Sequence, residues 1–167
     1  MSDYEKEQLL TTTIQINASD IYRTKNIDGL IQYRLKEQLE GVCGKYGYVI
    51  HDSISIINRS IGKAITHNEQ SKIEYNLTYK MKVILPCESE IFTCKIDNIT
   101  KMGIIAYMKM KDDNSIKDSP ILFIVPQDYI EDDIDLYTKD QIINIEVLQK
   151  RIKYRTKQIQ VVGKISK

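Results

Sequence analysis

Several features that would point to a function class are missing from this 167-residue chain. Its 24 lysines and arginines nearly cancel its 23 aspartates and glutamates, so the formal net charge is only +1. A net charge of that size does not draw a molecule to nucleic acid or membrane, so any such binding must depend on a local patch. No apolar run is long enough to cross a bilayer, and the first residues lack a basic stretch followed by an apolar one. We therefore expect an intracellular protein with no membrane contact.

Cysteine and histidine are scarce as well. The three cysteines, Cys43, Cys87 and Cys94, form no CxxC pair, and their odd number argues against a disulfide framework. We expect them to be small buried apolar residues. The two histidines, His51 and His67, have no cysteine or carboxylate at metal-ligand spacing, so the sequence predicts no metal site built on them.

Catalytic and cofactor motifs are also missing. The Gly62-Lys63 pair lies in "SIGKA", where Ala64 replaces the serine or threonine with which a phosphate-binding loop holds magnesium, and the earlier glycine of that loop is absent. The acidic segment 131–135 lacks the glycine and the alternating spacing of a calcium loop, and we interpret it as a solvated connection. No nucleophile has an adjacent base. We expect no catalytic residue, no metal and no cofactor.

Hydrophobic periodicity predicts the elements of the first half. Residues 9–17 alternate like a strand. Apolar residues at spacings of three and four predict a helix that begins after the N-cap Asn26 and stops at Gly41. Residues 48–57 are strand formers, and a turn at 58–62 follows them, which predicts a β-hairpin.

The clearest alternation runs from Ile73 to Leu85 and predicts a long strand with one buried face. Pro86 ends this strand, because proline cannot donate a hydrogen bond to a strand ladder, and we place a domain boundary there. The predicted domains are residues 1–85, which are α+β, and residues 86–167, which are all-β.

The second half contains five short runs of strand character with turns between them and no convincing long helix. These runs are residues 91–99, 103–109, 121–125, 142–150 and 158–165. Their spacing predicts a small antiparallel barrel, and five strands suit an OB-fold.

The stretch "EGVCGKYGYVI", residues 40–50, places three glycines and two tyrosines after the predicted helix. "GKYG" within it fits the GXXG loop of a KH nucleic-acid-binding module, but strand formers follow here where a KH module has a helix. A different family carries an E-G-x-C segment closely followed by aromatic-Gly-aromatic-[VI], and its order of elements continues through "IEYNLTYKMKVILP", "ESEIFTCKIDNITKMGIIAYM" and "ILFIVPQDYI". From about Thr12 to Lys164 the chain thus resembles the stalk subunit of multisubunit DNA-directed RNA polymerases, the seventh-subunit family of eukaryotic RNA polymerase II and its archaeal E-type relative.

This resemblance implies a fold and a non-catalytic role. The implied fold is a tip domain resembling a truncated RNP fold, followed by an OB-fold RNA-binding domain. In the family, the tip docks on the polymerase core near the clamp, a small fourth-subunit-type partner completes a heterodimer, the barrel lies near the nascent RNA, and catalysis resides in the two largest subunits. The resemblance implies a core-docking role for Gly44, Lys45, Tyr46, Gly47, Tyr48, Asn58, Arg59, Gly62 and Lys63.

The predicted barrel offers six candidate RNA-binding residues. Tyr107 and Phe123 are candidate stacking surfaces, because every base presents a π-face to an aromatic ring. The candidate phosphate contacts are Lys95, Lys109, Lys153 and Arg155. The chain departs from the family at Ile105, where relatives usually have an aromatic residue two positions after the strand-two glycine.

The sequence leaves the source and two other function classes open. Its abundance of Ile, Lys and Asn is compatible with an AT-rich eukaryote, which implies the nucleus, or with a large DNA virus encoding its own polymerase, which implies the virion or the host-cell cytoplasm. One alternative is a freestanding OB-fold RNA-binding or translation factor. The other is a metal-dependent nuclease that uses the acidic segment.

Overall fold

The computed structural model describes residues 4–110 and 115–167; residues 1–3 of the predicted first domain and 111–114 of the predicted second domain lie outside the described residues. The chain divides into two compact units. The first unit consists of Glu5–Glu40 and Val49–Val83, and the second consists mainly of Gly41–Tyr48 and Ile84–Lys167. This division differs from the predicted one at Pro86 chiefly in the segment Gly41–Tyr48, which belongs to the second unit.

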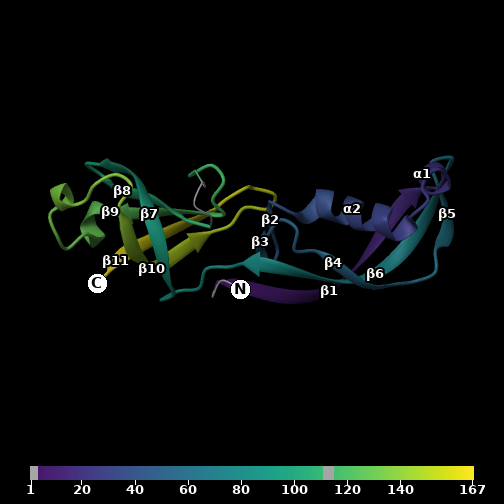
Figure 1. Ribbon diagram of the computed structural model, residues 1–167, viewed down its shortest axis with the longest axis horizontal. Helices are drawn as coiled ribbons and strands as arrows, with labels where there is room; N and C mark the ends of the chain where they lie inside the picture. The colour runs from purple at the N-terminus through teal and green to yellow at the C-terminus, as the bar shows by residue number, and fades with distance from the viewer. Residues whose placement is uncertain (1–3, 111–114) are drawn as a thin grey trace. The chain divides into compact units, whose positions relative to one another are not determined.

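The first unit is built on strands with a helix along one face (Figure 1). Its elements are β1 (Glu5–Asn17), α1 (Ala18–Arg23), α2 (Ile27–Leu39), β4 (Ser55–Arg59), β5 (Lys63–His67) and β6 (Gln70–Ile84). The sheet order is β1-β6-β3-β2, in which β2 is Cys43–Gly44 and β3 is Gly47–Val49, and β4 and β5 also pair with β6. The long strand β6 is therefore the centre of the sheet.

The predicted alternation in β6 and the predicted helix are both confirmed. From Tyr75 to Val83 every second residue of β6 is buried, namely Tyr75, Leu77, Tyr79, Met81 and Val83, whereas Ile73 is only half-buried. The helix α2 adds the buried side chains of Ile31 and Leu35 to this core. At its start, the Asn26 side chain accepts a hydrogen bond from the Gly29 N–H at 3.0 Å, which satisfies one of the unpaired amides of the first turn.

The predicted hairpin around residues 58–62 is wrong. The strands on either side of this turn, β4 and β5, do not pair with each other; each pairs antiparallel with β6. The hairpin joins β5 to β6 through Asn68 and Glu69, whose φ angles of 48° and 61° are both positive. A two-residue turn with positive φ at both positions matches the twist of the flanking strands. The turn is not evident from the sequence because "NE" lacks the glycine that usually marks such a turn.

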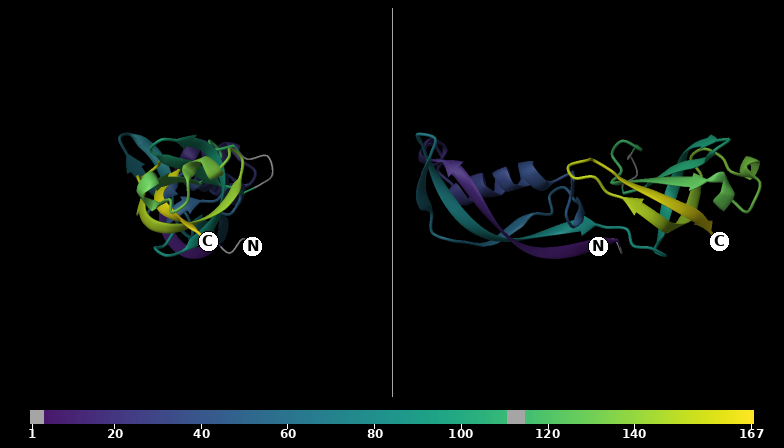
Figure 2. Two further views of the ribbon diagram at one scale, coloured as in Figure 1. Left: turned by 90° about the vertical axis from the view of Figure 1, so that its left-hand side faces the viewer. Right: turned by 180° about the vertical axis from the view of Figure 1, so that it is seen from behind.

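The second unit contains the predicted barrel of five strands (Figure 2). The strands are β7 (Ile91–Thr100), β8 (Gly103–Met108), β9 (Ile121–Pro126), β10 (Ile142–Arg151) and β11 (Ile159–Ser166). The barrel closes in the order β10-β11-β9-β8-β7, and every pairing is antiparallel except the parallel pair β11 and β9. Two 3-10 helices, η1 (Gln127–Tyr129) and η2 (Ile134–Leu136), lie between β9 and β10. This closed five-stranded barrel is consistent with an OB-fold.

As a whole, the described part of the chain is mostly β. Helix in it is confined to α1, α2 and the two 3-10 turns, so the α+β, RNP-like description of the first unit stays a prediction. No helix in the described ranges combines the length and apolar character needed to cross a membrane.

Candidate nucleic-acid interface

The two aromatic residues predicted to stack on RNA are not available for stacking. Phe123 is fully buried, and its ring packs on Phe92 with 5.6 Å between ring centroids. Tyr107 is only 5 % exposed. Phe123 points into the barrel, whereas Tyr107 lies on the opposite face of the sheet, where it pairs with Leu122 and Lys95 and its side chain is covered. Strand alternation gives each strand one inward face, and sequence alone does not say which face that is. This part of the predicted site is therefore wrong.

Of the four predicted phosphate contacts, Lys95 lies on β7 and Lys109 follows the end of β8. The Lys95 Nζ is 3.4 Å from an Asp140 carboxylate oxygen, and the hydrogen bond and charge of Asp140 raise the pKa of Lys95. Lys109 is exposed and directly follows β8. Lys153 and Arg155, in contrast, both lie in the exposed loop between β10 and β11.

A hollow of about 400 Å³ lies beside this loop, and we call it the basic hollow. Its lining residues are Lys117, Arg151, Lys153, Thr156, Lys157, Gln158 and Gln160. Four of the seven are cations and none is acidic. Among the residues the structure describes, no carboxylate forms an ion pair with any of the four. The described lining of the hollow therefore concentrates positive charge without a paired carboxylate.

One wall of the basic hollow is a tight turn in the β10–β11 loop. The Thr156 N–H and hydroxyl both donate to the Lys153 carbonyl, at 3.2 and 2.7 Å. Between them, Arg155 has φ of 63° while Tyr154 does not have a positive φ, which is the pattern of a type II turn. The Tyr154 ring is 75 % exposed at the tip of this turn. An exposed aromatic side chain among cations is the combination that single-stranded nucleic acid binds.

The other wall is the segment 115–119, which contributes Lys117. Its turn is closed by a bond of 2.8 Å from the Ser115 hydroxyl to the Asp118 carboxylate. The side-chain amide of Gln158 donates to the carbonyls of Ile116 and Ser119, which flank Lys117. The Gln158 side chain thus joins the two walls, beside the backbone hydrogen bond of 2.8 Å from the Ile159 N–H to the Pro120 carbonyl.

The segment Gly41–Tyr48 is hydrogen-bonded to the β10–β11 loop. The Cys43 N–H donates to the Thr156 carbonyl at 2.7 Å, and the Arg155 N–H donates to the Cys43 carbonyl at 2.8 Å. These two bonds explain why the segment belongs to the second unit. Gly47 is needed for it, since its φ is 119° and a Cβ there would lie 2.4 Å from the Ile84 carbonyl oxygen.

The nine predicted core-docking residues therefore divide between the two units. Gly44, Lys45, Tyr46, Gly47 and Tyr48 lie in the supporting segment of the second unit. Burial raises the pKa of the Tyr48 hydroxyl, and its side chain is only 7 % exposed, so it offers little surface to a partner. The Lys45 ammonium lies over the Tyr46 ring, 5.5 Å from its centroid.

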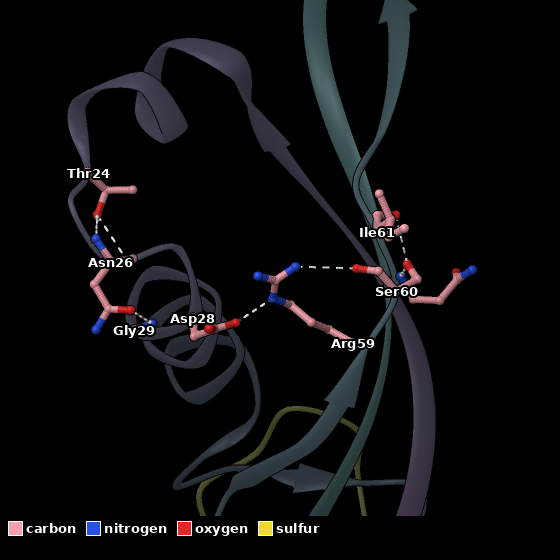
Figure 3. A network of polar contacts seen from close by, with 8 residues as sticks. Thr24, Asn26, Asp28, Gly29, Arg59, Ser60 and Ile61 are labelled. Atoms are coloured by element: carbon pink, nitrogen blue, oxygen red, sulfur yellow. Dashed lines mark hydrogen bonds and ion pairs between the residues drawn. The ribbon is translucent and has the colours of Figure 1, made fainter.

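The other four, Asn58, Arg59, Gly62 and Lys63, belong to the first unit and lie in or beside the turn between β4 and β5. Figure 3 shows Arg59 between Asp28 and Ser60. Arg59 pairs with Asp28 at the start of α2, and this hydrogen bond and charge raise the pKa of the Arg59 guanidinium. Ser60 exchanges backbone and side-chain hydrogen bonds with the Asn76 backbone, each 2.9 Å long. This network holds the turn while the Ile61 side chain stays 92 % exposed.

Four residues at or beside the basic hollow were not among the predicted site residues, namely Lys117, Arg151, Tyr154 and Lys157. A signal was present, because the chain has no acidic residue after Glu146. The same stretch contains seven cations, namely Lys150, Arg151, Lys153, Arg155, Lys157, Lys164 and Lys167. The net charge of +1 hides this local excess.

The arrangement can attract phosphate groups and stack a base. Among residues 4–110 and 115–167, no group of three or more His, Cys, Asp or Glu side chains is placed to hold a metal ion. In the acidic segment, the Lys167 ammonium lies 3.2 Å from Glu131 and 3.7 Å from Asp132. No protein-family model and no curated protein matches the chain.

Proposed function

We propose that this protein is a non-catalytic stalk subunit of a DNA-directed RNA polymerase that docks on the polymerase core and holds nascent RNA on its barrel. The observation that carries the proposal is the basic hollow on a closed five-stranded barrel, with the exposed ring of Tyr154 beside it. The assignment to a polymerase comes from the sequence resemblance, and the hollow offers a surface on which the transcript can bind.

The position of the hollow supports the RNA-binding part. OB-folds bind oligonucleotides with the face of strands two and three and with the loops that join strands one to two and four to five. The loop between β10 and β11 joins the fourth and fifth strands of this barrel. Its lysines and arginines would contact the phosphates, and stacking on Tyr154 would contribute about 1–3 kcal/mol per base.

The first unit supports the docking part. A sheet covered by α2 on one face is compatible with the truncated RNP-like tip that the resemblance implies. The turn between β4 and β5 presents Ile61 to solvent on a hydrogen-bonded frame, as a docking turn requires. A small fourth-subunit-type partner would complete the stalk, and catalysis would reside in the two largest subunits.

Affinity purification of the tagged full chain from its native source, followed by quantitative mass spectrometry, tests this proposal. We expect the two largest polymerase subunits in near-stoichiometric amount, because a stalk subunit is a permanent component. The same eluate identifies the polymerase, shows whether the small partner is present, and indicates whether the source is a cell or a virion. Recovery of the chain alone, or with ribosomes, would contradict the stalk assignment.

A freestanding OB-fold RNA-binding factor is the second candidate, and one observation favours it. All residues that line the basic hollow belong to the second unit, so RNA binding needs no polymerase. This candidate predicts RNA binding by a protein that purifies without polymerase subunits. The purification and an RNA-binding assay together separate the two functions.

A further inference from the structure

The two walls of the basic hollow come from segments far apart in the sequence. The β10–β11 side provides Arg151, Lys153 and Lys157, whereas the segment 115–119 provides Lys117. A single-stranded RNA that lies in the hollow can therefore have its phosphates contacted from both sides, provided that the second wall is held in place.

The hydrogen bonds identify what holds that wall. The turn of 115–118 is closed on itself, by the Ser115 hydroxyl and by the Asp118 N–H, which donates to the Ser115 carbonyl at 3.1 Å. The buried Ser119 hydroxyl lies 2.8 Å from the Met108 carbonyl and 2.9 Å from the Ile121 carbonyl, and its one proton is shared between them. This contact fixes the end of the segment, where β9 begins. In the described part of the chain, the Ile159 N–H also donates to the Pro120 carbonyl at 2.8 Å, but none of these bonds ties the residues on both sides of Lys117 to the opposite wall.

Gln158 provides that tie. Its side-chain NH₂ donates to the carbonyls of Ile116 and Ser119, one on each side of Lys117. Both acceptors are carbonyl oxygens, so the amide must present its two N–H donors to them, which a carboxylate cannot do. The Gln158 backbone is fixed in turn by the Thr156 hydroxyl, which lies 3.2 Å from the Gln158 carbonyl.

We propose that Gln158 is a positioning residue that holds Lys117 against the β10–β11 loop, so that the basic hollow grips the backbone of single-stranded RNA from two sides. This inference rests on the RNA-binding part of the proposed function and is independent of the polymerase. Gln158 acts through Lys117, and its own amide is occupied by the two carbonyls.

A double-mutant cycle on the full chain tests this role. The probe is a fluorescent oligouridine of about 12 nucleotides, within the length that one OB-fold covers. Binding is followed by anisotropy at several salt concentrations for the original chain, Lys117→Ala, Gln158→Ala and the double variant. Loss of one exposed charge contact should lower affinity roughly two- to fivefold and reduce the salt slope by about 0.7. Gln158→Ala should lower affinity and reduce the salt slope by the same amounts. The double variant should bind no more weakly than either single variant.

Gln149→Ala is the matched control, because Gln149 is an exposed glutamine on β10 of the same unit and does not line the hollow. It should leave affinity and salt slope unchanged. Thermal unfolding of each variant identifies any general loss of structure, which would not produce a slope change equal to that of Lys117→Ala. Additive losses in the double variant, an unchanged Gln158→Ala, or no binding by the original chain would each overturn the proposal. Failure to recover polymerase would overturn the stalk function and leave this inference standing.

Discussion

Arg155 has a backbone conformation that residues other than glycine rarely adopt. Its φ of 63° places it in the left-handed region, at the position of a type II turn where glycine is preferred. Non-glycine residues pay about 1–2 kcal/mol for this conformation. Such local strain is typical of functional sites, and this turn carries the exposed Tyr154 beside the basic hollow.

Two substitutions of Arg155 separate its charge from its backbone. Arg155→Gly and Arg155→Ala remove the same charge, so both should weaken binding of oligouridine to the same extent. Only glycine relieves the left-handed strain, so we expect its free energy of unfolding to exceed that of the alanine variant by about 1 kcal/mol. Urea denaturation and anisotropy measure the two quantities. Equal stabilities would contradict the strain, and unchanged affinities would exclude the guanidinium from the RNA contact.

The buried thiols make stability depend on alkaline pH. Burial raises the pKa of Cys94 and of Cys43, so both thiols stay protonated in the folded protein at a pH where the unfolded chain ionises. Their contribution is fully present below the unfolded pKa of about 8.5 and is lost as the pH rises above it. Each thiol should therefore lower the free energy of unfolding by about 1 kcal/mol per pH unit above that point.

Cys94→Ala tests this dependence. Between about pH 8 and about pH 10, the original chain should lose more free energy of unfolding than the variant does, even though the variant starts lower because of its cavity. Cys87→Ala is the control, because Cys87 is exposed and its replacement removes no buried thiol. If Cys94→Ala and the original chain lose equal amounts, the buried thiol does not contribute to the pH dependence.

At the scale of elements, strand and helix positions could be predicted from the sequence, and pairings only in part. The alternation in β6 and the spacing in α2 each reflect one buried face, which the sequence encodes directly. The pairing of β4 and β5 with β6 depends on long-range contacts, and the turn at Asn68 and Glu69 uses residues that rarely mark it. The wrong candidate in the site has a related cause. Alternation shows that a strand has two faces, but it does not say which face is inward, so Phe123 was predicted as a stacking surface although it is buried.

The turn between β4 and β5 is the element on which core docking can be tested. Ile61 is 92 % exposed, so Ile61→Ser should change the free energy of unfolding by less than about 0.5 kcal/mol. If the turn docks on the polymerase, the same change should reduce recovery of the two largest subunits, because an apolar anchor is lost from the interface. Leu9→Ser serves as the control, since Leu9 is 65 % exposed on β1 and lies outside the predicted docking residues. Equal recovery with Ile61→Ser and Leu9→Ser would exclude this turn from the interface.

At the scale of the whole molecule, net charge and local charge make different predictions for RNA binding. The chain carries +1 overall, yet four cations line the basic hollow without an acidic residue among them. If all four contact phosphates of a single strand, the logarithm of affinity should fall by roughly 3 per tenfold rise in salt. Affinity for oligouridine should then drop roughly fiftyfold between about 50 and about 200 mM salt.

Substitution of two lysines of the second unit tests whether the local charge of the hollow is responsible for the salt dependence of RNA binding. Lys153→Ala and Lys139→Ala change the net charge equally, and both residues are exposed, but only Lys153 lines the hollow. Lys153→Ala should lower the salt slope by about 0.7, because one fewer counterion contact is made, whereas Lys139→Ala should leave the slope unchanged. Anisotropy titrations at four or more salt concentrations give both slopes. Equal changes in the two variants would mean that the RNA contacts the barrel diffusely, and the near-neutral net charge would then leave its binding too weak to guide a transcript.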